Sequence, residues 1–246
     1  MSTMIQTIIF TDLDGTLLDE TYSYRRALPA LELVRKKRIP IVFCTSKTLP
    51  EAEYYRYRLD NNDPLIVESG GAIYIPENYF NFKFSFDRKT SKYFIIELGT
   101  PYQKLRKVLK NLKRKDIIVK GFGDMSDYEL SRNSGLSFSK VHLAKQRGYS
   151  EPFNIVKGNE DKVRKLIEGN GFNFVKGGRY YHIMGNNDKG KAVMILNRLF
   201  KKKFKKIKSM GFGNSENDLP MLEAVDEGYM VNGPKDWNRT VMRLLK

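Results

Sequence analysis

Short apolar segments and amphipathic helical patterns alternate along the first third of the chain. Apolar runs rich in β-branched residues predict three buried strands, over residues 7–11, 39–44 and 65–68. Residues 24–38 carry apolar side chains at helical spacing, and Thr48 and Glu51 have the pattern of a capping box at a helix start. After a turn, a further strand runs back over residues 72–75. Strands that alternate with helices predict a parallel sheet covered by helices on both faces.

The pattern changes between about residues 82 and 187, where aromatic and partly alternating segments replace the buried runs. They predict an antiparallel sheet with helices on one face, with strands over residues 83–87, 93–98, 153–156, 172–175 and 180–184. The helices of this part are expected over residues 101–113, 126–132, 138–147 and 160–170.

From residue 189 the alternation of helix and strand resumes and continues to the end of the chain. Helices are predicted over residues 190–200 and 216–224 and at the C-terminus, and strands over 207–212 and 229–231. The sequence therefore predicts two domains. An α/β core consists of residues 1–81 and 188–246, and an α+β domain of residues 82–187 is inserted into it.

Composition narrows the class of protein. At 246 residues, of which 41% are hydrophobic, the chain can form one or two packed domains. It has no apolar run near the roughly 20 residues that span a bilayer, and its N-terminal segment lacks the features of a secretion signal. Cys44 is the only cysteine, which excludes an internal disulfide and a cysteine-based zinc site. We therefore expect a cytoplasmic protein with no membrane partner.

The net charge of +16 is concentrated in basic runs at residues 35–38, 104–115 and 201–208. Such runs can bind nucleic acid, or they can be solvated helix faces. Because no nucleic-acid-binding motif accompanies them, we interpret them as solvated faces and expect no nucleic-acid partner. The positive charge is compatible with an anionic small-molecule substrate.

Two carboxylates stand at the end of the first predicted strand, in the segment IIFTDLDGTLLDE at residues 8–20. Asp12 follows the strand directly, and Asp14 returns to the same side if the chain bends at Gly15. An aspartate here can also be a plain turn residue. A calcium loop does not fit, because a frame that starts at Asp12 has Leu17 where glycine is needed. Parallel sheets bind ligands at the carboxyl ends of their strands, so this pair is a candidate catalytic or metal site.

The segment DLDGT resembles motif I of the haloacid dehalogenase-like (HAD) phosphatases, and three further motifs of that superfamily follow in order. Thr45 in IVFCTS matches the Thr or Ser of motif II, and Lys189 in NNDKGKAV matches the lysine of motif III. The segment GFGNSENDLPML resembles motif IV but departs from it, because Asn214 replaces the first Asp while Asp218 is retained. An amide oxygen can still bind a metal ion, with one negative charge fewer.

The resemblance implies an α/β fold, a HAD-like Rossmannoid core with a parallel sheet, and a Mg²⁺-dependent phosphatase. Asp12 would attack phosphorus and form an aspartyl phosphate, and Asp14 would act as general acid and then as general base. Thr45 and Lys189 would hold the phosphoryl oxygens. A hard, oxygen-preferring cation such as Mg²⁺ would offset the negative charge, with four expected metal ligands: Asp12, Asp14, Asn214 and Asp218.

The inserted domain resembles the C2B-type cap of the Cof-like HAD branch. Within this branch, CTSKT, residues 143–153 and residues 177–193 are similar to the mannosyl-3-phosphoglycerate phosphatase family, and the match covers nearly the whole chain. It implies hydrolysis of a small phosphorylated sugar-glycerate, mannosyl-3-phosphoglycerate, to mannosylglycerate and phosphate, a step in making that compatible solute. A broader sugar or sugar-acid phosphatase, a phosphomannomutase-like enzyme and a nucleic-acid-binding protein with a vestigial core remain the alternatives.

Several residues are candidates for contact with the parts of the substrate beyond the phosphate. Arg147 and Arg179 could pair with the glycerate carboxylate, although arginines at such places are often solvated. Hydroxyl partners for the sugar, and two residues beside the catalytic loop, complete the candidate set: Ser150, Glu151, His182, Ser46 and Lys47. His182 could equally be a half-buried sheet residue. We expect a monomer or a homodimer.

Overall fold

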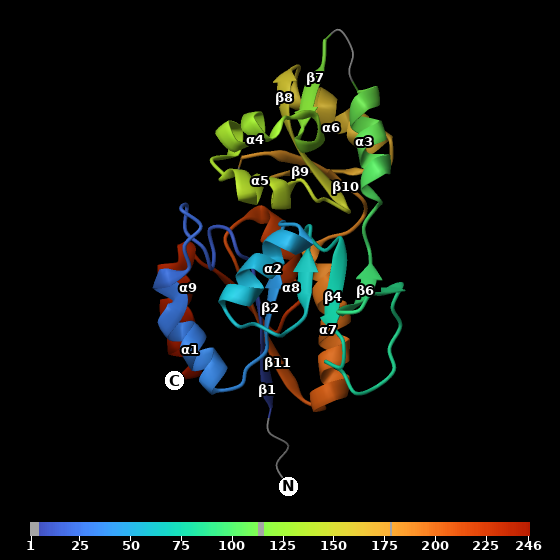
Figure 1. Cartoon of the computed structure of the whole chain (residues 1–246). Coiled ribbons are helices and arrows are strands. Elements are labelled where there is room, and N and C mark those ends of the chain that lie inside the picture. Colours follow the sequence, from blue (N-terminus) through green and yellow to red (C-terminus); the bar gives the residue numbers. More distant parts are fainter. Residues whose placement is uncertain (1–4, 113–115, 178) are drawn as a thin grey trace.

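The computed structural model describes residues 5–112, 116–177 and 179–246. Its larger sheet contains the strands β1 (Gln6–Thr11), β2 (Ile41–Cys44), β3 (Leu65–Val67), β4 (Ala72–Pro76), β5 (Arg88–Lys89), β6 (Tyr93–Glu97), β11 (Ile207–Gly213) and β12 (Glu227–Met230). They lie in the order β12-β11-β1-β2-β3-β4-β6-β5 (Figure 1). The pairs from β12 to β3 are parallel and those from β3 to β5 are antiparallel. The predicted parallel sheet is confirmed, with an antiparallel extension at one edge.

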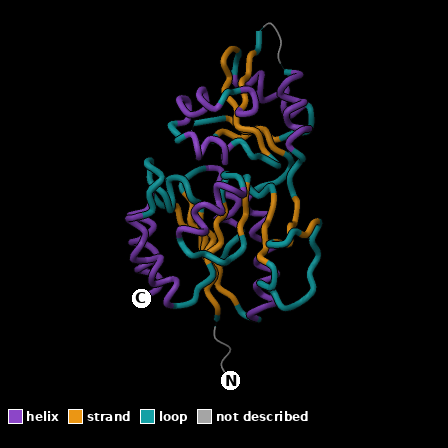
Figure 2. Tube along the Cα trace, in the orientation of Figure 1, coloured by secondary structure: helices purple, strands orange, loops and turns teal. Residues whose placement is uncertain are grey.

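Helices cover both faces of this sheet, as Figure 2 shows. They are α1 (Leu28–Lys36), which follows the 3₁₀ turn η1 (Arg25–Ala27), α2 (Leu49–Arg58), α7 (Lys189–Phe204), α8 (Leu219–Glu223), which follows η3 (Glu216–Asp218), and α9 (Gly233–Leu245). Successive side chains of a strand point to opposite faces. On β1, Ile9 therefore packs in one apolar cluster with α1, α2 and α9, whereas Ile8 and Phe10 pack in another with α7 and α8.

The start of α2 follows from its sequence. Thr48 accepts a hydrogen bond from the backbone N–H of Glu51, and the Glu51 carboxylate accepts one from the Thr48 backbone N–H at 3.0 Å. This is the predicted capping box, with Pro50 in the first helical turn. This capping box begins α2 directly after the short loop that follows β2.

A smaller antiparallel sheet lies above the larger one in Figure 1. Its strands are β7 (Ile118–Gly121), β8 (Ser150–Lys157), β9 (Asn173–Lys176) and β10 (Tyr181–Met184), in the order β7-β8-β10-β9. Helices α3 (Tyr102–Asn111) and α6 (Glu160–Gly169) pack on one face of it. The turn η2 (Phe122–Asp124) and the helices α4 (Asp127–Ser134) and α5 (Phe138–Ala144) form a separate apolar cluster. We call residues 102–184 the cap and the remainder the core.

Of the first two strands expected in the inserted domain, one belongs to the core sheet and the other does not form. β6 pairs with β4, with Tyr74 opposite Ile95, and residues 83–87 are not a strand. The larger sheet therefore includes β5 and β6, which lie within the range predicted for the inserted domain. An aromatic strand pattern shows that a face is buried but not which sheet it joins, because that depends on pairing between distant segments. The sequence also missed β7 and extended α5 to residue 147, and the predicted helix end at residue 113 lies outside the described residues.

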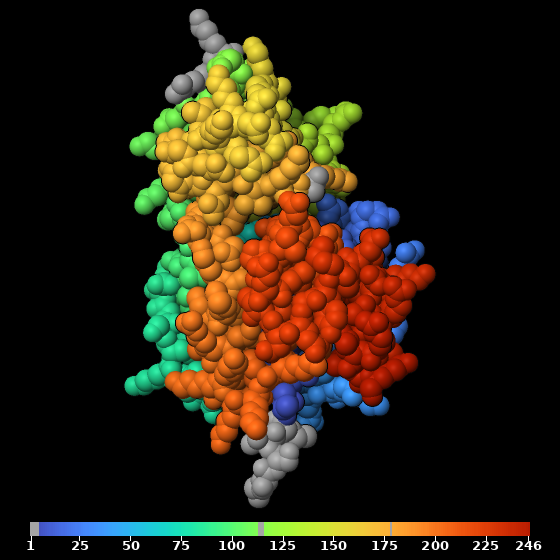
Figure 3. Space-filling model, turned by 180° about the vertical axis from the view of Figure 1, so that it is seen from behind, coloured from blue at the N-terminus to red at the C-terminus, as the bar shows by residue number. Residues whose placement is uncertain are grey.

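The back of the core presents α7 and the C-terminal segments, coloured orange and red in Figure 3, below the cap. Much of the basic run at residues 201–208 lies at the exposed end of α7. No helix in the described part of the chain is both long and apolar enough to cross a membrane.

Candidate active site

The carboxyl ends of three neighbouring parallel strands bring the predicted motifs together. Asp12 follows β1, Thr45 follows β2 and Asn214 follows β11, and these three strands are adjacent in the sheet. The Asp12 backbone N–H donates to the carbonyl of Phe212 at 2.9 Å, which continues the β1–β11 ladder to Asp12. Parallel strands end on the same edge, so the fold itself assembles the site.

Lys189 links two of the predicted carboxylates. Its Nζ lies 2.6 Å from Oδ1 of Asp12 and 2.5 Å from Oδ1 of Asp218. The Lys189 side chain is 1% exposed and that of Asp218 is 0% exposed. Lys189 is the first residue of α7, whose N-cap Asp188 accepts a hydrogen bond from the Lys191 N–H at 2.8 Å. Lys191 instead extends to Asn186 at the surface, so the structure places Lys189, not Lys191, in the site.

Burial perturbs the ionisation of this triad. It raises the pKa of Asp12 to about 7, although the charge of Lys189 acts in the opposite direction. Burial by itself would lower the pKa of Lys189, but the charges of Asp12 and Asp218 outweigh it and raise that pKa above its ordinary value. Burial would likewise raise the pKa of Asp218, yet Lys189 holds it below its ordinary value. Lys189 is therefore a permanent cation between two buried acids.

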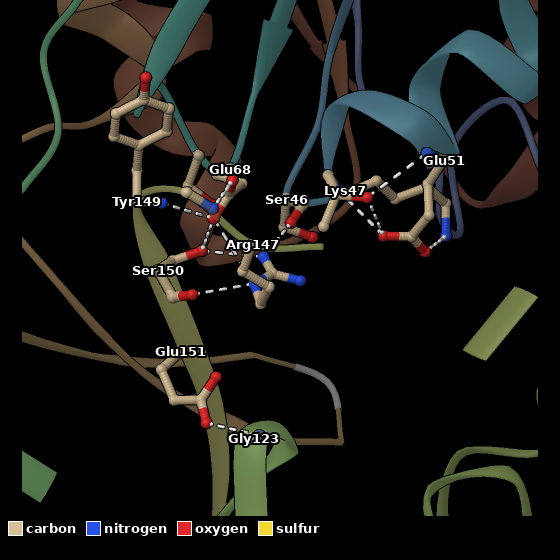
Figure 4. A network of polar contacts seen from close by, with 12 residues as sticks. Ser46, Lys47, Glu51, Glu68, Gly123, Arg147, Tyr149, Ser150 and Glu151 are labelled. Atoms are coloured by element: carbon tan, nitrogen blue, oxygen red, sulfur yellow. Dashed lines mark hydrogen bonds and ion pairs between the residues drawn. The ribbon is translucent and has the colours of Figure 1, made fainter. Parts of the chain in front are cut away.

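Asp14 has a cationic partner of its own. Lys47 Nζ lies 2.8 Å from Asp14 Oδ2 and 3.7 Å from Glu51 Oε1, and its side chain is only 7% exposed (Figure 4). Burial would lower the pKa of Lys47, but the two carboxylates raise it above its ordinary value. Sequence reasoning placed Lys47 beside the substrate. The structure places it at the cavity wall, where it holds the proposed general acid.

The loop after β11 is held by Asp218. Its Oδ2 accepts hydrogen bonds from the backbone N–H groups of Asn214 and Ser215, both at 3.0 Å, while its Oδ1 faces Lys189. These contacts favour a part for Asp218 in shaping the loop, and direct metal binding by it stays a prediction. Asn214 is exposed, and its Oδ1 accepts from Thr16 Oγ1 at 3.2 Å.

Gly15 allows the close approach of the Asn214 amide. Its φ is +72°, and a Cβ there would lie 2.3 Å from Asn214 Nδ2. Any other residue would therefore push the Asn214 side chain away from the aspartate loop. The segment DLDGT thus needs its glycine for a steric reason as well as for the turn.

The residues present suit a hard divalent cation. Asp14 Oδ1 is buried and has no hydrogen-bond partner among the described residues. The Asp12 carboxylate and the Asn214 amide oxygen both lie next to the loop that contains Asp14. Carboxylate, carbonyl and amide oxygens are the donors that Mg²⁺ prefers. The described residues contain no group of three or more His, Cys, Asp and Glu side chains placed to hold a metal ion. The donor set therefore fits a site completed by substrate oxygens and water.

Thr45 is fully buried at the end of β2. Its Oγ1 accepts a hydrogen bond from the Lys47 backbone N–H at 3.2 Å, and its own N–H donates to the Ile66 carbonyl. It is not among the described residues that line the cavity, so its contact with a phosphoryl oxygen stays a prediction.

A cavity of about 540 Å³ lies between the core and the cap. Of the predicted site residues, nine line it: Asp12, Asp14, Ser46, Lys47, Arg147, Arg179, His182, Lys189 and Asn214. This volume is sufficient for a small phosphorylated substrate. The walls carry positive charge from both parts of the protein, which suits an anionic ligand.

Strand register decides which cap residues face this cavity. His182 on β10 lies opposite Pro152 on β8 and Val175 on β9, and all three line the cavity. Glu151 lies opposite Ile183 and therefore points to the other face, towards α3. Burial, with a smaller contribution from Arg147, lowers the pKa of His182 to about 3, so His182 is a neutral hydrogen-bonding group at neutral pH.

Glu151 does not line the cavity, and its predicted contact with the sugar stays a prediction. Its side chain is 0% exposed, pairs with Arg106 at 2.8 Å and accepts from the Gly123 N–H at 2.9 Å (Figure 4). One residue along a strand reverses the face, so Glu151 stabilises the interior of the cap instead.

Arg147 and Ser150 join the cap to the core. Glu68, between β3 and β4, accepts hydrogen bonds from the N–H groups of Gly148 and Tyr149, and from Ser150 Oγ at 2.9 Å (Figure 4). Arg147 lies 3.5 Å from Glu68 and donates to the Ser46 carbonyl at 2.8 Å. Ser150 is 2% exposed and does not line the cavity, so its predicted contact with the sugar stays a prediction.

Arg179 reaches the cavity from the loop before β10. Its Nη1 donates a hydrogen bond to the Ser134 carbonyl, and the residue also lines the cavity. The lining residues that the sequence did not single out include Tyr22, Arg26 and Lys235. All three lie on core loops or helix starts, where no periodic pattern marks a residue that faces the cap.

Comparison with known proteins agrees with this geometry. The sequence pattern of the haloacid dehalogenase-like hydrolase family matches residues 9–236. The chain belongs to this family. A relative from Methanococcoides burtonii, named glucosyl-3-phosphoglycerate/mannosyl-3-phosphoglycerate phosphatase, is 41% identical and covers 97% of each chain. The mannosyl-3-phosphoglycerate phosphatase of Pyrococcus furiosus is 40% identical over 91% of this chain and 90% of its own.

The fold has a counterpart among solved structures. A protein described as a HAD subclass IIB sugar phosphatase superposes with a TM-score of 0.63 at 15% identity, over 97% of this chain and 98% of that one. At this identity the likeness concerns the fold alone. It confirms the predicted HAD-like core with its antiparallel cap.

Proposed function

We propose that this HAD-family protein is a Mg²⁺-dependent phosphatase that hydrolyses mannosyl-3-phosphoglycerate to mannosylglycerate and phosphate. The observation that carries the proposal is the buried Asp12–Lys189–Asp218 triad, whose first two residues line the cavity between core and cap. The names of relatives that match over nearly the whole chain support the substrate.

Asp12 is the proposed nucleophile. Its carboxylate attacks phosphorus, the bond from phosphorus to the sugar-glycerate oxygen breaks, and an aspartyl phosphate forms. Burial raises the pKa of Asp12, and the nearby Lys189 ammonium acts in the opposite direction and favours the reactive carboxylate form. Lys189 also offers positive charge to the phosphoryl oxygens, and Thr45 is proposed to add a hydroxyl donor.

Asp14 is the proposed proton carrier. It gives a proton to the departing alkoxide oxygen, then takes one from the water that hydrolyses the aspartyl phosphate. Lys47, 2.8 Å from Asp14 Oδ2, orients this carboxylate and keeps the second oxygen turned towards the site. The two aspartates therefore pair with different lysines: Asp12 with Lys189, and Asp14 with Lys47.

Asp12, the backbone carbonyl of Asp14 and Asn214 are the proposed metal-binding groups, with Asp218 holding the Asn214 loop. When bound, Mg²⁺ would offset the charge of the phosphate and the carboxylates. In the cap, Arg179 and Arg147 are proposed to face the glycerate carboxylate, and His182 a sugar hydroxyl. The oligomeric state, predicted as monomer or homodimer, and the predicted cytoplasmic location complete the proposal.

The deciding experiment measures phosphate release from mannosyl-3-phosphoglycerate with Mg²⁺ or with EDTA. Glucosyl-3-phosphoglycerate, sucrose phosphate and sugar monophosphates are assayed beside it. We expect EDTA to abolish release and the sugar-3-phosphoglycerates to react at least about tenfold faster than the other esters. Similar rates on all esters would contradict the specific substrate, and EDTA-resistant release would contradict the metal.

Glucosyl-3-phosphoglycerate is the second candidate substrate. The relatives from Methanococcoides burtonii and Persephonella marina, 41% and 38% identical, are named for both sugars. The two sugars differ at one hydroxyl, and a single hydrogen bond separates them by a modest factor. The ratio of the two kcat/KM values decides between a selective and a dual enzyme.

Asn214→Asp is expected to lower the apparent dissociation constant for Mg²⁺, because it restores a negative charge at the family's usual position. The size expected is about tenfold or less, since the new carboxylate lies at the exposed rim of the site. A Mg²⁺ titration of activity measures it, with Asn217→Asp as the matched control in the same loop. An unchanged titration would remove Asn214 from the metal site.

A further inference from the structure

One loop of the core, residues 19–23, carries a side chain to the underside of the cap. The Asp19 carboxylate accepts hydrogen bonds from the Thr21 and Ser23 N–H groups, both at 2.9 Å. The Tyr22 N–H donates to the Asp19 carbonyl, and the Ser23 carbonyl accepts from the Asp19 N–H. These bonds hold the loop in a single tight turn that projects its central residue.

Tyr22 occupies a backbone conformation that is rare for a residue with a side chain. Its φ is +62°, in the left-handed region that favours glycine. A bulky residue in this left-handed conformation costs free energy. Such strain persists only where contacts with surrounding residues stabilise the conformation. Contacts of the Tyr22 ring must therefore stabilise this conformation.

The Tyr22 ring meets both parts of the protein. It packs against the apolar cluster of the cap that includes Phe122, Leu136 and Val141, although Tyr22 itself belongs to the core. It also lines the cavity. No hydrogen-bond partner of the Tyr22 hydroxyl occurs in the described ranges of the chain, so the contacts of this residue are made by its ring.

Two ammonium groups lie over this ring, one from each part. Lys47 Nζ from the core is 4.9 Å from the ring centroid, and Lys140 Nζ from α5 of the cap is 4.8 Å from it. Both distances fall within the range of attractive cation–π contacts. Like charges this close to one another repel, and the electron-rich face of the ring offsets that repulsion. Lys47 in turn holds the Asp14 carboxylate at 2.8 Å.

We infer that Tyr22 is a positioning residue that couples the cap to the Lys47–Asp14 pair and so determines selectivity for esters large enough to reach the cap. A substrate that fills the cavity holds the cap in place over Tyr22, and the ring then fixes Lys47 beside the general acid. A small phosphate ester makes no such contact with the cap. The inference rests on the proposed phosphatase function and adds a specificity element that the family motifs do not contain.

The test compares Tyr22→Leu and Tyr22→Phe on two substrates, mannosyl-3-phosphoglycerate and the small aryl ester 4-nitrophenyl phosphate. Leucine removes both cation–π contacts, so we expect kcat/KM on the sugar ester to fall by on the order of tenfold or more. The same variant should keep kcat/KM on the aryl ester within about threefold of wild type. Phenylalanine retains the ring face and should stay within about threefold on both. Tyr57→Leu, at a core tyrosine that is 90% exposed, is the matched control.

Lys140→Met isolates the cap side of the contact. It should reproduce part of the selective loss, and the double variant with Tyr22→Leu should lose less than the product of the two single effects. Equal losses on both substrates would mean that Tyr22 only maintains the fold, and no loss on either would mean that the ring does not couple the parts. Each result would overturn the inference.

Hydrogen exchange provides a readout that does not depend on activity. In Tyr22→Leu the backbone amides of α5 should exchange faster than in wild type, by about threefold or more, whereas in Tyr22→Phe they should not change. If the wild type hydrolyses neither ester, the proposed function fails, while this measurement still decides whether Tyr22 couples the cap to the core. Unchanged exchange of α5 in Tyr22→Leu would overturn it.

Discussion

Replacing Asp12 by asparagine is expected to reduce phosphate release by about 10⁴-fold or more, because an amide cannot form the acyl phosphate. The variant should fold, since asparagine has nearly the same shape and can keep a hydrogen bond with Lys189. Phosphate release under saturating Mg²⁺ measures the effect. Asp60→Asn, at an exposed aspartate of the core, should leave the rate unchanged. A variant at Asp12 with near wild-type turnover would contradict its assignment as nucleophile.

The same variant should reveal the cost of ionising Asp12 in the metal-free protein. The pKa of Asp12 is raised from 3.8 to about 7 in the folded state. A raised pKa of this kind contributes stability below pH 3.8 that is lost as the pH rises through 7, because the folded state then has to release a proton that it binds tightly. Asparagine resembles the neutral form and avoids this loss.

Urea unfolding of both proteins in EDTA tests this linkage. Asp12→Asn should gain free energy of unfolding relative to wild type between pH 5 and pH 8, by an amount on the order of 1–3 kcal/mol. The two proteins should differ least at pH 5, where wild-type Asp12 is mostly protonated. A difference that is constant across this range would show that Asp12 does not titrate within it.

Lys189→Met is expected to produce the second large effect, on activity and on stability together. Methionine fills a similar volume but leaves Asp12 and Asp218 buried without the cation between them. Removing one partner of a buried ion pair costs about 3–5 kcal/mol. Phosphate release should fall by about 10³-fold or more, because the phosphoryl oxygens lose the same charge.

The loss of stability should itself depend on pH. At pH 5 Asp12 can bind a proton, so Lys189→Met should be less destabilising there than at pH 8. Lys191→Met is the matched control, because Lys191 is two residues away with a side chain that is 42% exposed. Its effect should stay within about 0.5 kcal/mol. Equal effects of the two substitutions would contradict the assignment of Lys189.

Much of the site was predictable because the motif residues stand next to strands and helices that the hydrophobic pattern predicts. Asp12 directly follows a buried apolar strand, and Lys189 begins a helix after an aspartate that caps it. Since parallel strands end on one edge, order along the chain was sufficient to predict that Asp12, Thr45 and Asn214 would meet. The confirmed fold follows from the same alternation of strand and helix.

The cap was less predictable, and Glu151 shows why. Its neighbour in sequence, Ser150, and its neighbour across the sheet, Ile183, point in directions set by strand register. Register depends on which strands pair, and this is a property of the folded chain. The same reason applies to β6. Its pattern correctly predicted a strand, but the sequence did not show that this strand pairs with β4 in the core.

By itself the sequence determined most of the strand-and-helix order and the four motifs, and hence which residues are proposed as nucleophile, proton carrier and phosphate-binding lysine. These depend on local patterns and on the common direction of parallel strands. Only the tertiary structure decided that Lys47 pairs with Asp14, that Glu68 and Arg147 join cap to core, and that Tyr22 lies under Lys140. Each of these contacts joins residues from separate segments of the chain, and such proximity is set by packing, which no local pattern encodes.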